Sequence, residues 1–269
     1  MAILAASCGP ASQPAGPTRL PELELPEAEW PEVELIVTVT RVGDGDSFRD
    51  ESTDGEIEAR LAGINSPELD ECHGRAARDA LRDMIEGRTI GLVAGPEFDQ
   101  FDRVLARAVV DDVYVNLAMV LGGHSLVVSE PGPDRNSLVE AEAIARAGEA
   151  GWWAGDVCGA AGPRAGLEII GIDYDPSGPD DNESVVIANT GSSSLNLEGF
   201  VLRDESSVNR LKLPPLVLDP GAEVEVVRTC DTAPKNQVAW CSDQPVWNND
   251  GDTALLLDPF GRIVAFLRY

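Results

Sequence analysis

The chain has 269 residues, 43% of them hydrophobic, which is enough for one or two ordinary cores. It carries 47 acidic and 20 basic residues, a net charge of −27, and the acidic excess is spread along the whole sequence. This balance argues against broad contact with duplex DNA, which needs a basic patch. The two histidines, His73 and His124, have no metal-ligand spacing and argue against a zinc or histidine-based nuclease site. We expect His73 to be exposed before a helix and His124 to lie in a loop.

Residues 1–32 have the composition of a leader followed by a tether. A short apolar run with small residues ends at Cys8 and looks like the end of a lipoprotein signal. In that interpretation Cys8 is lipidated and anchors the protein outside the cell; the alternative is a plain tail with an isolated cysteine. Prolines and glutamates in residues 9–32 predict an extended, stiff tether. No later segment approaches the length of a transmembrane helix.

Residues 33–158 form the first predicted domain. Apolar positions at helical spacing predict two helices whose stripes face a core, and alternating β-branched stretches predict strands. The predicted strands are 33–42, 56–61, 89–94 and 104–110, and the predicted helices are 74–86 and 136–148. Strands closed around a small barrel with attached helices suit an OB-type fold. We expect Trp152 and Trp153 to cover that core near Cys158.

The residues that carry chemistry gather around segment 60–68, which reads R-L-A-G-I-N-S-P-E. An acidic turn, 43–47, precedes it and Arg103 follows it. Calcium takes carboxylate and carbonyl oxygens, arginine grips phosphate, and a carboxylate can activate water. These are the components for cutting a phosphodiester bond. Taken alone, the acidic turn is a hairpin signal, and residues 65–68 are a helix start with Ser66 as N-cap.

In order and spacing these segments resemble the staphylococcal-nuclease-like (thermonuclease) family, over roughly residues 33–158. That family has D-G-D-T, then R-L-x-x-x-D-T-P-E, then D-x-Y-G-R. The corresponding segments here are 44–47 (D-G-D-S), 60–68 and 99–103 (D-Q-F-D-R). The resemblance implies a five-stranded OB-type barrel with helices.

The resemblance also implies a role for individual residues. Calcium ligands would hold the ion beside the phosphate, where it polarises a phosphoryl oxygen. A carboxylate would orient or activate the attacking water, and two arginines would stabilise the charge that develops on the phosphate. The implied calcium ligands are Asp46, Asn65 and the backbone carbonyl of Ser66, and the implied catalytic residues are Arg60, Glu68 and Arg103.

Two positions depart from the family pattern. Asn65 supplies an amide oxygen where the family often has a carboxylate, which weakens calcium binding because affinity follows ligand charge. Asp102 replaces the glycine before Arg103, where it could pair with that arginine and hold it away from substrate. Two hypotheses therefore stay open. One is an active calcium-dependent nuclease; the other is a catalytically impaired binding or surface module.

Five cysteines suggest an oxidising compartment. We predict two disulfides, Cys72–Cys158 and Cys230–Cys241, with Cys8 apart from both. The alternative is four free, buried thiols. Since no C-x-x-C pair occurs, a structural zinc site is disfavoured.

Residues 159–166, rich in glycine, alanine and proline, are the predicted interdomain linker, and the second predicted domain covers 167–269. Here short apolar runs alternate with turn signals, which indicates a β-sandwich. Segments such as L-E-G-F-V-L and W-N-N-D-G-D resemble the lamin-tail family, which implies an immunoglobulin-like sandwich but no shared catalytic set. Trp240 and Trp247 could stack on bases, although core packing is the commoner role. The acids Asp173, Asp175, Asp180 and Asp181 are either a second calcium site or a solvated loop.

These features together predict a secreted or surface-anchored, calcium-dependent nuclease. Its substrate would be DNA or RNA, in single-stranded form, because an unpaired strand can lie in an OB groove. The second domain would be an interaction domain. In the alternative hypothesis that domain carries the function by docking a partner.

Overall fold

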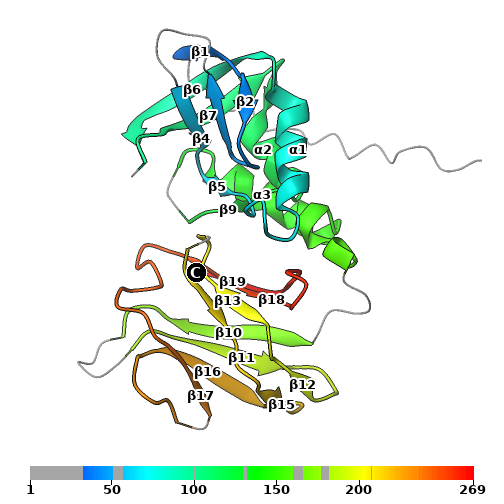
Figure 1. Cartoon of the computed structure of the whole chain (residues 1–269), viewed down its shortest axis with the longest axis vertical. Helices are drawn as coiled ribbons and strands as arrows, with labels where there is room; N and C mark the ends of the chain where they lie inside the picture. The colour runs from blue at the N-terminus through cyan, green and yellow to red at the C-terminus, as the bar shows by residue number, and fades with distance from the viewer. Residues whose placement is uncertain are drawn as a thin grey trace, which may run out of the picture. The chain divides into compact units, whose positions relative to one another are not determined.

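The computed structural model describes residues 33–50, 57–99, 101–129, 132–159, 166–176, 182–206, 208–234 and 236–269. By internal contacts, residues 31–269 form one compact unit. The expected lipidation of Cys8, the tether 1–32 and most of the linker 159–166 lie outside the described residues. In the described part of the chain, no helix is both long enough and apolar enough to span a membrane. The architecture is mainly β with some helices, as the sequence predicts (Figure 1).

The first half contains a seven-stranded sheet in which Val37, Phe48 and Ala59 are buried core residues. The strand order is β1-β6-β7-β4-β3-β2, with β8 paired to β7. All pairs are antiparallel except β4 with β7. The strands are β1 (Leu35–Thr38), β2 (Arg41–Val42), β3 (Ser47–Asp50), β4 (Ile57–Leu61), β6 (Thr89–Phe98), β7 (Val104–Val110) and β8 (Val113–Tyr114).

The two edge strands of this sheet, β1 and β2, follow each other in the sequence. The predicted strand 33–42 is broken in the structure into β1 and β2, which are separated by Val39 and Thr40. The amide of Val39 donates to the carbonyl of Arg88 at 2.9 Å, whereas Thr40 donates to Arg49 at 2.9 Å. One bent segment therefore pairs with β6 on one side and with β3 on the other. Among the described strands β1 and β2 do not pair with each other, so the hydrogen-bonded ladder remains open.

Three helices accompany this sheet, together with a short two-stranded sheet and two 3₁₀ turns. In α1 the buried residues Ala77, Leu81 and Ile85 recur at the predicted spacing. The second helix was not predicted, because its sequence V-N-L-A-M-V-L is apolar without an amphipathic period. The helices are α1 (Gly74–Ile85), α2 (Val115–Leu121) and α3 (Arg135–Ala147); the short strands are β5 (Ile64–Asn65) and β9 (Leu126–Val127); the 3₁₀ turns are η1 (Gly151–Trp153) and η2 (Val157–Gly159).

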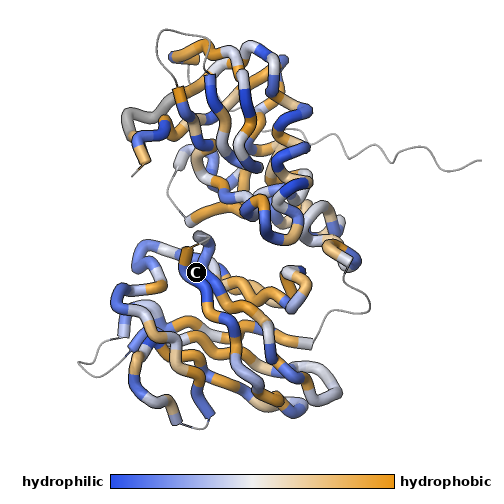
Figure 2. The backbone as a smooth tube through the Cα atoms, in the orientation of Figure 1, coloured by the Kyte–Doolittle hydropathy of each residue, from blue (hydrophilic) through white to orange (hydrophobic). Residues whose placement is uncertain are grey.

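The second half is built from short strands whose hydrophobic residues gather along the sheets (Figure 2). Two four-stranded sheets have the orders β10-β11-β16-β17 and β14-β13-β18-β19, and β12 pairs with β15. The strands are β10 (Leu167–Asp173), β11 (Ser184–Asn189), β12 (Leu195–Asn196), β13 (Val201–Arg203), β14 (Arg210–Lys212), β15 (Val217–Leu218), β16 (Glu223–Arg228), β17 (Gln237–Trp240), β18 (Thr253–Leu257) and β19 (Ile263–Arg268). The apolar runs predicted from the sequence correspond to seven of these strands, and β10, β15 and β17 are additional.

The core of this half includes the two tryptophans whose role, base stacking or core packing, the sequence left open. Trp240 and Trp247 are buried among residues such as Ile187 and Leu202, and their rings meet edge to face at 5.9 Å. They are therefore core residues rather than an exposed stacking platform. Asp173 and Asp175 are exposed, and the other two acids of the expected loop lie outside the described residues.

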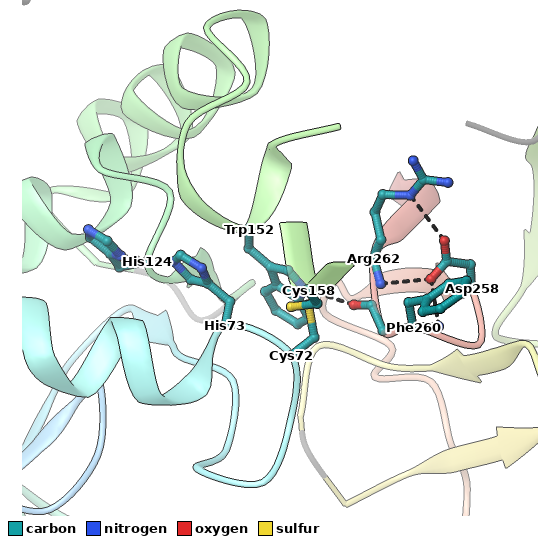
Figure 3. Close-up of a disulfide and its surroundings, with 9 residues drawn as sticks. Cys72, His73, His124, Trp152, Cys158, Asp258, Phe260 and Arg262 are labelled. Atoms are coloured by element: carbon teal, nitrogen blue, oxygen red, sulfur yellow. Dashed lines mark hydrogen bonds and ion pairs between the residues drawn. A yellow bond between two sulfur atoms is a disulfide. The ribbon is translucent and has the colours of Figure 1, made fainter. Parts of the chain in front are cut away.

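The structure joins Cys72 to Cys158 and Cys230 to Cys241, the two pairs predicted from the sequence. Around the first bridge, Trp152 donates from Nε1 to the carbonyl of Gly261 at 2.9 Å (Figure 3). Gly261 has φ +86°, and a Cβ there would lie 2.6 Å from the Cβ of Cys72. Only glycine allows this approach.

Trp152 and Trp153 are buried as expected, but they do not simply cover the first core. They belong to a separate cluster that also contains Leu255, Leu257 and Ile263 of the second half. Trp153 also meets the ring of Phe266 edge to face at 5.5 Å. The sequence prediction assigned these tryptophans to one domain because periodicity within a segment says nothing about its distant partners.

The two histidines, which were expected to be separate and in one case exposed, form a pair. His73 Nε2 lies 2.9 Å from His124 Nδ1, and the rings stack with their centroids 5.1 Å apart (Figure 3). His73 also has φ +69°, at the residue before α1. Burial lowers the pKa of His73 to about 4, with a further contribution from His124, and burial lowers the pKa of His124 as well.

We predict that His73 is neutral at pH 6. Burial lowers its pKa to about 4, so His73 should titrate near pH 4, and burial places the His124 midpoint below its ordinary value of 6.5. The chain has two histidines, so its imidazole proton resonances can be assigned by comparison with the His124→Gln variant. A midpoint near 6.5 for either ring in the native protein would contradict the buried pair.

We predict unequal contributions from the two disulfides. The bridges span 86 and 11 residues, so in the chain-entropy model they restrict the unfolded chain by about 4–5 and about 3 kcal/mol respectively. The Cys72→Ser/Cys158→Ser variant should therefore lose more free energy of unfolding than Cys230→Ser/Cys241→Ser. Urea unfolding of both variants measures the difference. An equal loss, or a larger one for the short loop, would show that chain entropy does not govern their contributions.

Candidate functional site

The predicted acidic turn lies between β2 and β3 and is held by its own side chains. Asp44 Oδ1 accepts hydrogen bonds from the backbone N–H of Asp46 at 3.0 Å and from Ser47 Oγ at 2.7 Å. A Cβ on Gly45 would lie 2.6 Å from the Cβ of Ser66. The glycine therefore lets the turn pack directly against the second predicted segment, and this contact brings Asp46 and Ser66 together.

Asp46 is the centre of the site. Its side chain is 3% exposed, and its Oδ1 pairs with Arg60 Nη1 at 2.5 Å. Its other oxygen, Oδ2, accepts the backbone N–H of Ser66 at 2.7 Å. Burial raises the pKa of Asp46 to about 7, although Arg60 acts in the opposite direction. The favourable contacts of the Asp46 carboxylate with Arg60 and Ser66 thus only partly offset the cost of burying its charge.

Asn65 joins this cluster through Arg60. Arg60 Nη2 donates to Asn65 Oδ1 at 2.6 Å, so a single guanidinium binds both predicted ligand side chains. The amide nitrogen of Asn65 donates to the backbone carbonyl of Glu205 at 2.8 Å. The two bonds fix which side of the amide carries oxygen. Sequence reasoning placed Arg60 toward a substrate, whereas here it faces inward, because the nearest anionic partner is Asp46.

Ser66 takes part through its backbone and its hydroxyl. Besides its N–H bond to Asp46, its Oγ lies 2.6 Å from Ser125 Oγ in a buried position. The structure gives it no N-cap role. The helix that follows starts at Gly74, eight residues further on. Residues 66–73 are therefore an irregular connection rather than a first helical turn.

Glu68 lies in that connection and is exposed. Its backbone N–H donates to Glu71 Oε2 at 2.8 Å. Burial lowers the pKa of Arg203, and the charge of Glu68 acts against that lowering.

Arg103 lies at the start of β7 and pairs with an acid of its own segment. Its Nε donates to Asp99 Oδ2 at 2.7 Å, and its guanidinium lies 5.4 Å from the ring centre of Phe101. The expected competitor, Asp102, is not the acid in this contact. Asp102 instead has φ +63°, the left-handed conformation that explains a glycine at this position in the resembling family.

A pocket of about 280 Å³ lies beside the acidic turn. Its lining residues come from β2, the acidic turn, β3, β4 and the residue before β7: Arg41, Gly43, Asp44, Ser47, Phe48, Arg49, Glu58 and Arg103. Arg41 pairs across the sheet with Arg49, and Arg49 with Glu58, so their side chains share one face. The sequence analysis missed Arg41 and Arg49. Strand alternation from the buried Val42 and Phe48 would have placed them on the outer face.

The cluster contains oxygen donors of the type that a calcium ion takes. Within the described ranges no three His, Cys, Asp or Glu side chains gather at a metal-binding distance. The oxygens of Asp46 and Asn65 are nevertheless hard donors, and with a pKa of about 7 the Asp46 carboxyl gains its full negative charge only above neutral pH. Backbone carbonyls and water would have to supply the remaining ligands. Arg60 would have to leave these oxygens first.

A search of curated proteins finds no match to the chain. A family comparison matches a segment that excludes the cluster around Asp46 and begins at the predicted linker. Residues 160–269 match the Lamin Tail Domain family, as the sequence resemblance predicted for the second half of the chain.

Proposed function

We propose that residues 33–158 are a thermonuclease-like unit that hydrolyses phosphodiester bonds of single-stranded DNA or RNA with calcium. The observation that carries the proposal is the cluster of Asp46, Arg60, Asn65 and Ser66. These residues are separated by up to 20 positions, yet hydrogen bonds of 2.5–2.7 Å join them. A pocket that includes Arg103 and Asp44 lies next to the same turn.

The strand arrangement supports the finer proposal of an OB-type barrel. The bent segment formed by β1 and β2 borders both ends of the sheet, which is how one long strand can close a small barrel. The buried residues of these strands, such as Val37, Phe48 and Leu92, form one core. Such a barrel presents its outer loops and strand ends to a ligand.

In this proposal the basic residues bind the phosphate. Eight residues line the pocket: three are the arginines Arg41, Arg49 and Arg103, and two are the acids Asp44 and Glu58, the second of which pairs with Arg49 at 2.9 Å. The pocket thus has an excess of basic residues in a chain whose net charge is −27. Guanidinium groups bind phosphate oxygens through paired, charge-assisted hydrogen bonds. Local basic residues therefore offset the general repulsion between this acidic protein and a polyanion.

Arg60 is the residue whose partner would change. It now binds Asp46 and Asn65, and a substrate phosphate would offer it an alternative anion. Glu68, exposed in the connection before α1, would orient or activate the water. Asp46 and Asn65, with the carbonyl of Ser66, would hold calcium. The ion, when bound, supplies charge stabilisation at the phosphoryl oxygen.

One observation favours a second candidate, a binding module with impaired catalysis. The two arginines proposed to stabilise the transition state are already paired with acids, Arg60 with Asp46 and Arg103 with Asp99. If these pairs persist in the presence of substrate, neither guanidinium can stabilise the transition state. The lamin-tail half would then provide the function by docking a partner.

The site of action in this proposal is outside the cytoplasm, on the cell surface or secreted. The two disulfides support it, since such bonds persist in oxidising compartments. Anchoring through a lipid on Cys8 is the membrane contact proposed.

We predict that the purified protein releases acid-soluble nucleotides from denatured DNA in calcium and none in chelator. Glu68→Gln should lower kcat by about 10²–10⁴-fold, as loss of a general base does. Arg60→Ala should lower it by about 10²–10³-fold, as loss of one transition-state donor does.

The controls for this assay are exposed residues away from the site. Glu198→Gln and Arg88→Ala should cut as well as the native protein, because Glu198 lies in the second half and Arg88 pairs with Asp111. No release by the native protein in calcium, or equal activity in Glu68→Gln, would favour the impaired module.

We predict that Asn65→Asp binds calcium more tightly, because it adds a negative charge to the ligand set. The same change removes the N–H donated to Glu205 and should lower the free energy of unfolding by about 1–3 kcal/mol. Calorimetric titration with calcium measures the affinity, with Asn196→Asp, an exposed position, as the control. Unchanged affinity would show that residue 65 is not a calcium ligand.

A further inference from the structure

The connection between β5 and α1, residues 66–73, carries Glu68 and begins beside Asn65. An eight-residue stretch without regular structure is poorly suited to hold a catalytic group unless other parts of the protein fix it. Its contacts show what fixes it. Several come from a short part of the lamin-tail half, residues 203–210, although the two segments are more than 130 positions apart in the sequence.

The first contact is at the start of the connection. Asn65 donates to the backbone carbonyl of Glu205 at 2.8 Å, and this bond is buried. The carboxylate of Glu205 accepts the backbone N–H of Ser129 at 2.8 Å and its hydroxyl at 2.7 Å. Since β5 pairs with β9 (Leu126–Val127), Glu205 is bound to one strand of that small sheet at Asn65 and to the chain two residues beyond the other strand at Ser129.

The second contact is at Glu71, near the middle of the connection. Its carboxylate accepts the backbone N–H of Glu68 at 2.8 Å. The same carboxylate pairs with Arg203 Nη1 at 3.3 Å and with Arg210 Nη2. The Arg203 side chain is fully buried and that of Glu71 is 10% exposed, so this pair is little screened by solvent. Glu71 thus joins the backbone of the predicted base to two arginines of the other half.

The third contact is at the end of the connection, where Cys72 is bonded to Cys158 and packs against Gly261. The connection is therefore held at Asn65, at Glu68 through Glu71, and at Cys72. Two of these three points depend directly on side chains or backbone of segment 203–210. A purely tethered interaction domain would have no need of such contacts.

We propose that Arg203, Glu205 and Arg210 are positioning residues for the phosphodiester site, so that the lamin-tail half completes that site. This rests on the proposed nuclease function for its catalytic consequence, but not for its structural one. The two arginines hold Glu71, which holds the Glu68 backbone, and Glu205 holds the Asn65 amide. A displacement of about 1 Å at a catalytic group can lower the rate about a hundredfold.

The test uses Arg210, because Arg203 is fully buried and its loss could prevent folding. Arg210→Met keeps the aliphatic stem and removes the guanidinium. Arg88→Met is the matched control, since the side chains of Arg88 and Arg210 are each 42% exposed and each pairs with one acid. Arg210→Lys restores the charge without the planar fork. All variants are made in the full chain and compared by thermal unfolding first.

The structural readout is hydrogen exchange, followed by mass spectrometry, of peptides covering residues 66–72 in calcium-free buffer. We expect exchange there to be at least about fivefold faster in Arg210→Met, unchanged in Arg88→Met and partly restored in Arg210→Lys. Equal exchange in the two methionine variants would overturn the proposal, whether or not the protein cuts nucleic acid.

The catalytic readout is kcat and KM on denatured DNA. We expect Arg210→Met to lower kcat about 10- to 100-fold with little change in KM, because the pocket arginines that bind substrate are untouched. Faster exchange with unchanged kcat would overturn the positioning role. If the native protein has no activity, the nuclease function fails and the exchange experiment alone decides whether segment 203–210 orders the connection.

Discussion

The buried carboxylate of Asp46 is the constraint around which the first half is organised. A carboxylate at 3% exposure needs partners, and it obtains them from two places that are distant in the sequence, Arg60 on β4 and the backbone of Ser66. These bonds fix the acidic turn against the segment that follows β5. Since removing one partner of a buried pair leaves an uncompensated charge, the arrangement resists change. Because its present partners offset only part of the cost of burying this charge, the Asp46 carboxylate would gain from binding a cation.

Arginine is the main means by which this acidic chain stabilises its buried carboxylates. Of its 20 basic residues, 18 are arginines. The planar guanidinium can bind two groups at once, as Arg60 binds Asp46 and Asn65, and as Arg268 binds Glu142 and the carbonyl of Val127. A lysine could replace neither contact fully. The buried positions of several of these arginines also explain why net charge alone describes the surface poorly.

Local features of the fold were predictable from the sequence, and long-range partners were not. The strand β7 occupies the predicted range 104–110, and α1 begins at the predicted Gly74, because alternation and helical spacing act within a few residues. The contact of Asn65 with Glu205 spans 140 positions, and no periodic pattern encodes it. The His73–His124 pair was missed for the same reason. The inward direction of Arg60 depends on competition between partners, which spacing cannot decide.

The two disulfides have a consequence for the covalent connectivity of the chain. Cys72 and Cys158 enclose the three helices and strands β6, β7 and β8 of the first sheet, and Cys230 and Cys241 follow the parallel neighbours β16 and β17 at the same end. A single proteolytic cut between residues 73 and 157, or between 231 and 240, would leave both fragments joined. Such a nick is invisible on a non-reducing gel and can leave the packed core in place. The disulfides can in this way preserve the folded protein after a cut in one of the loops that they enclose.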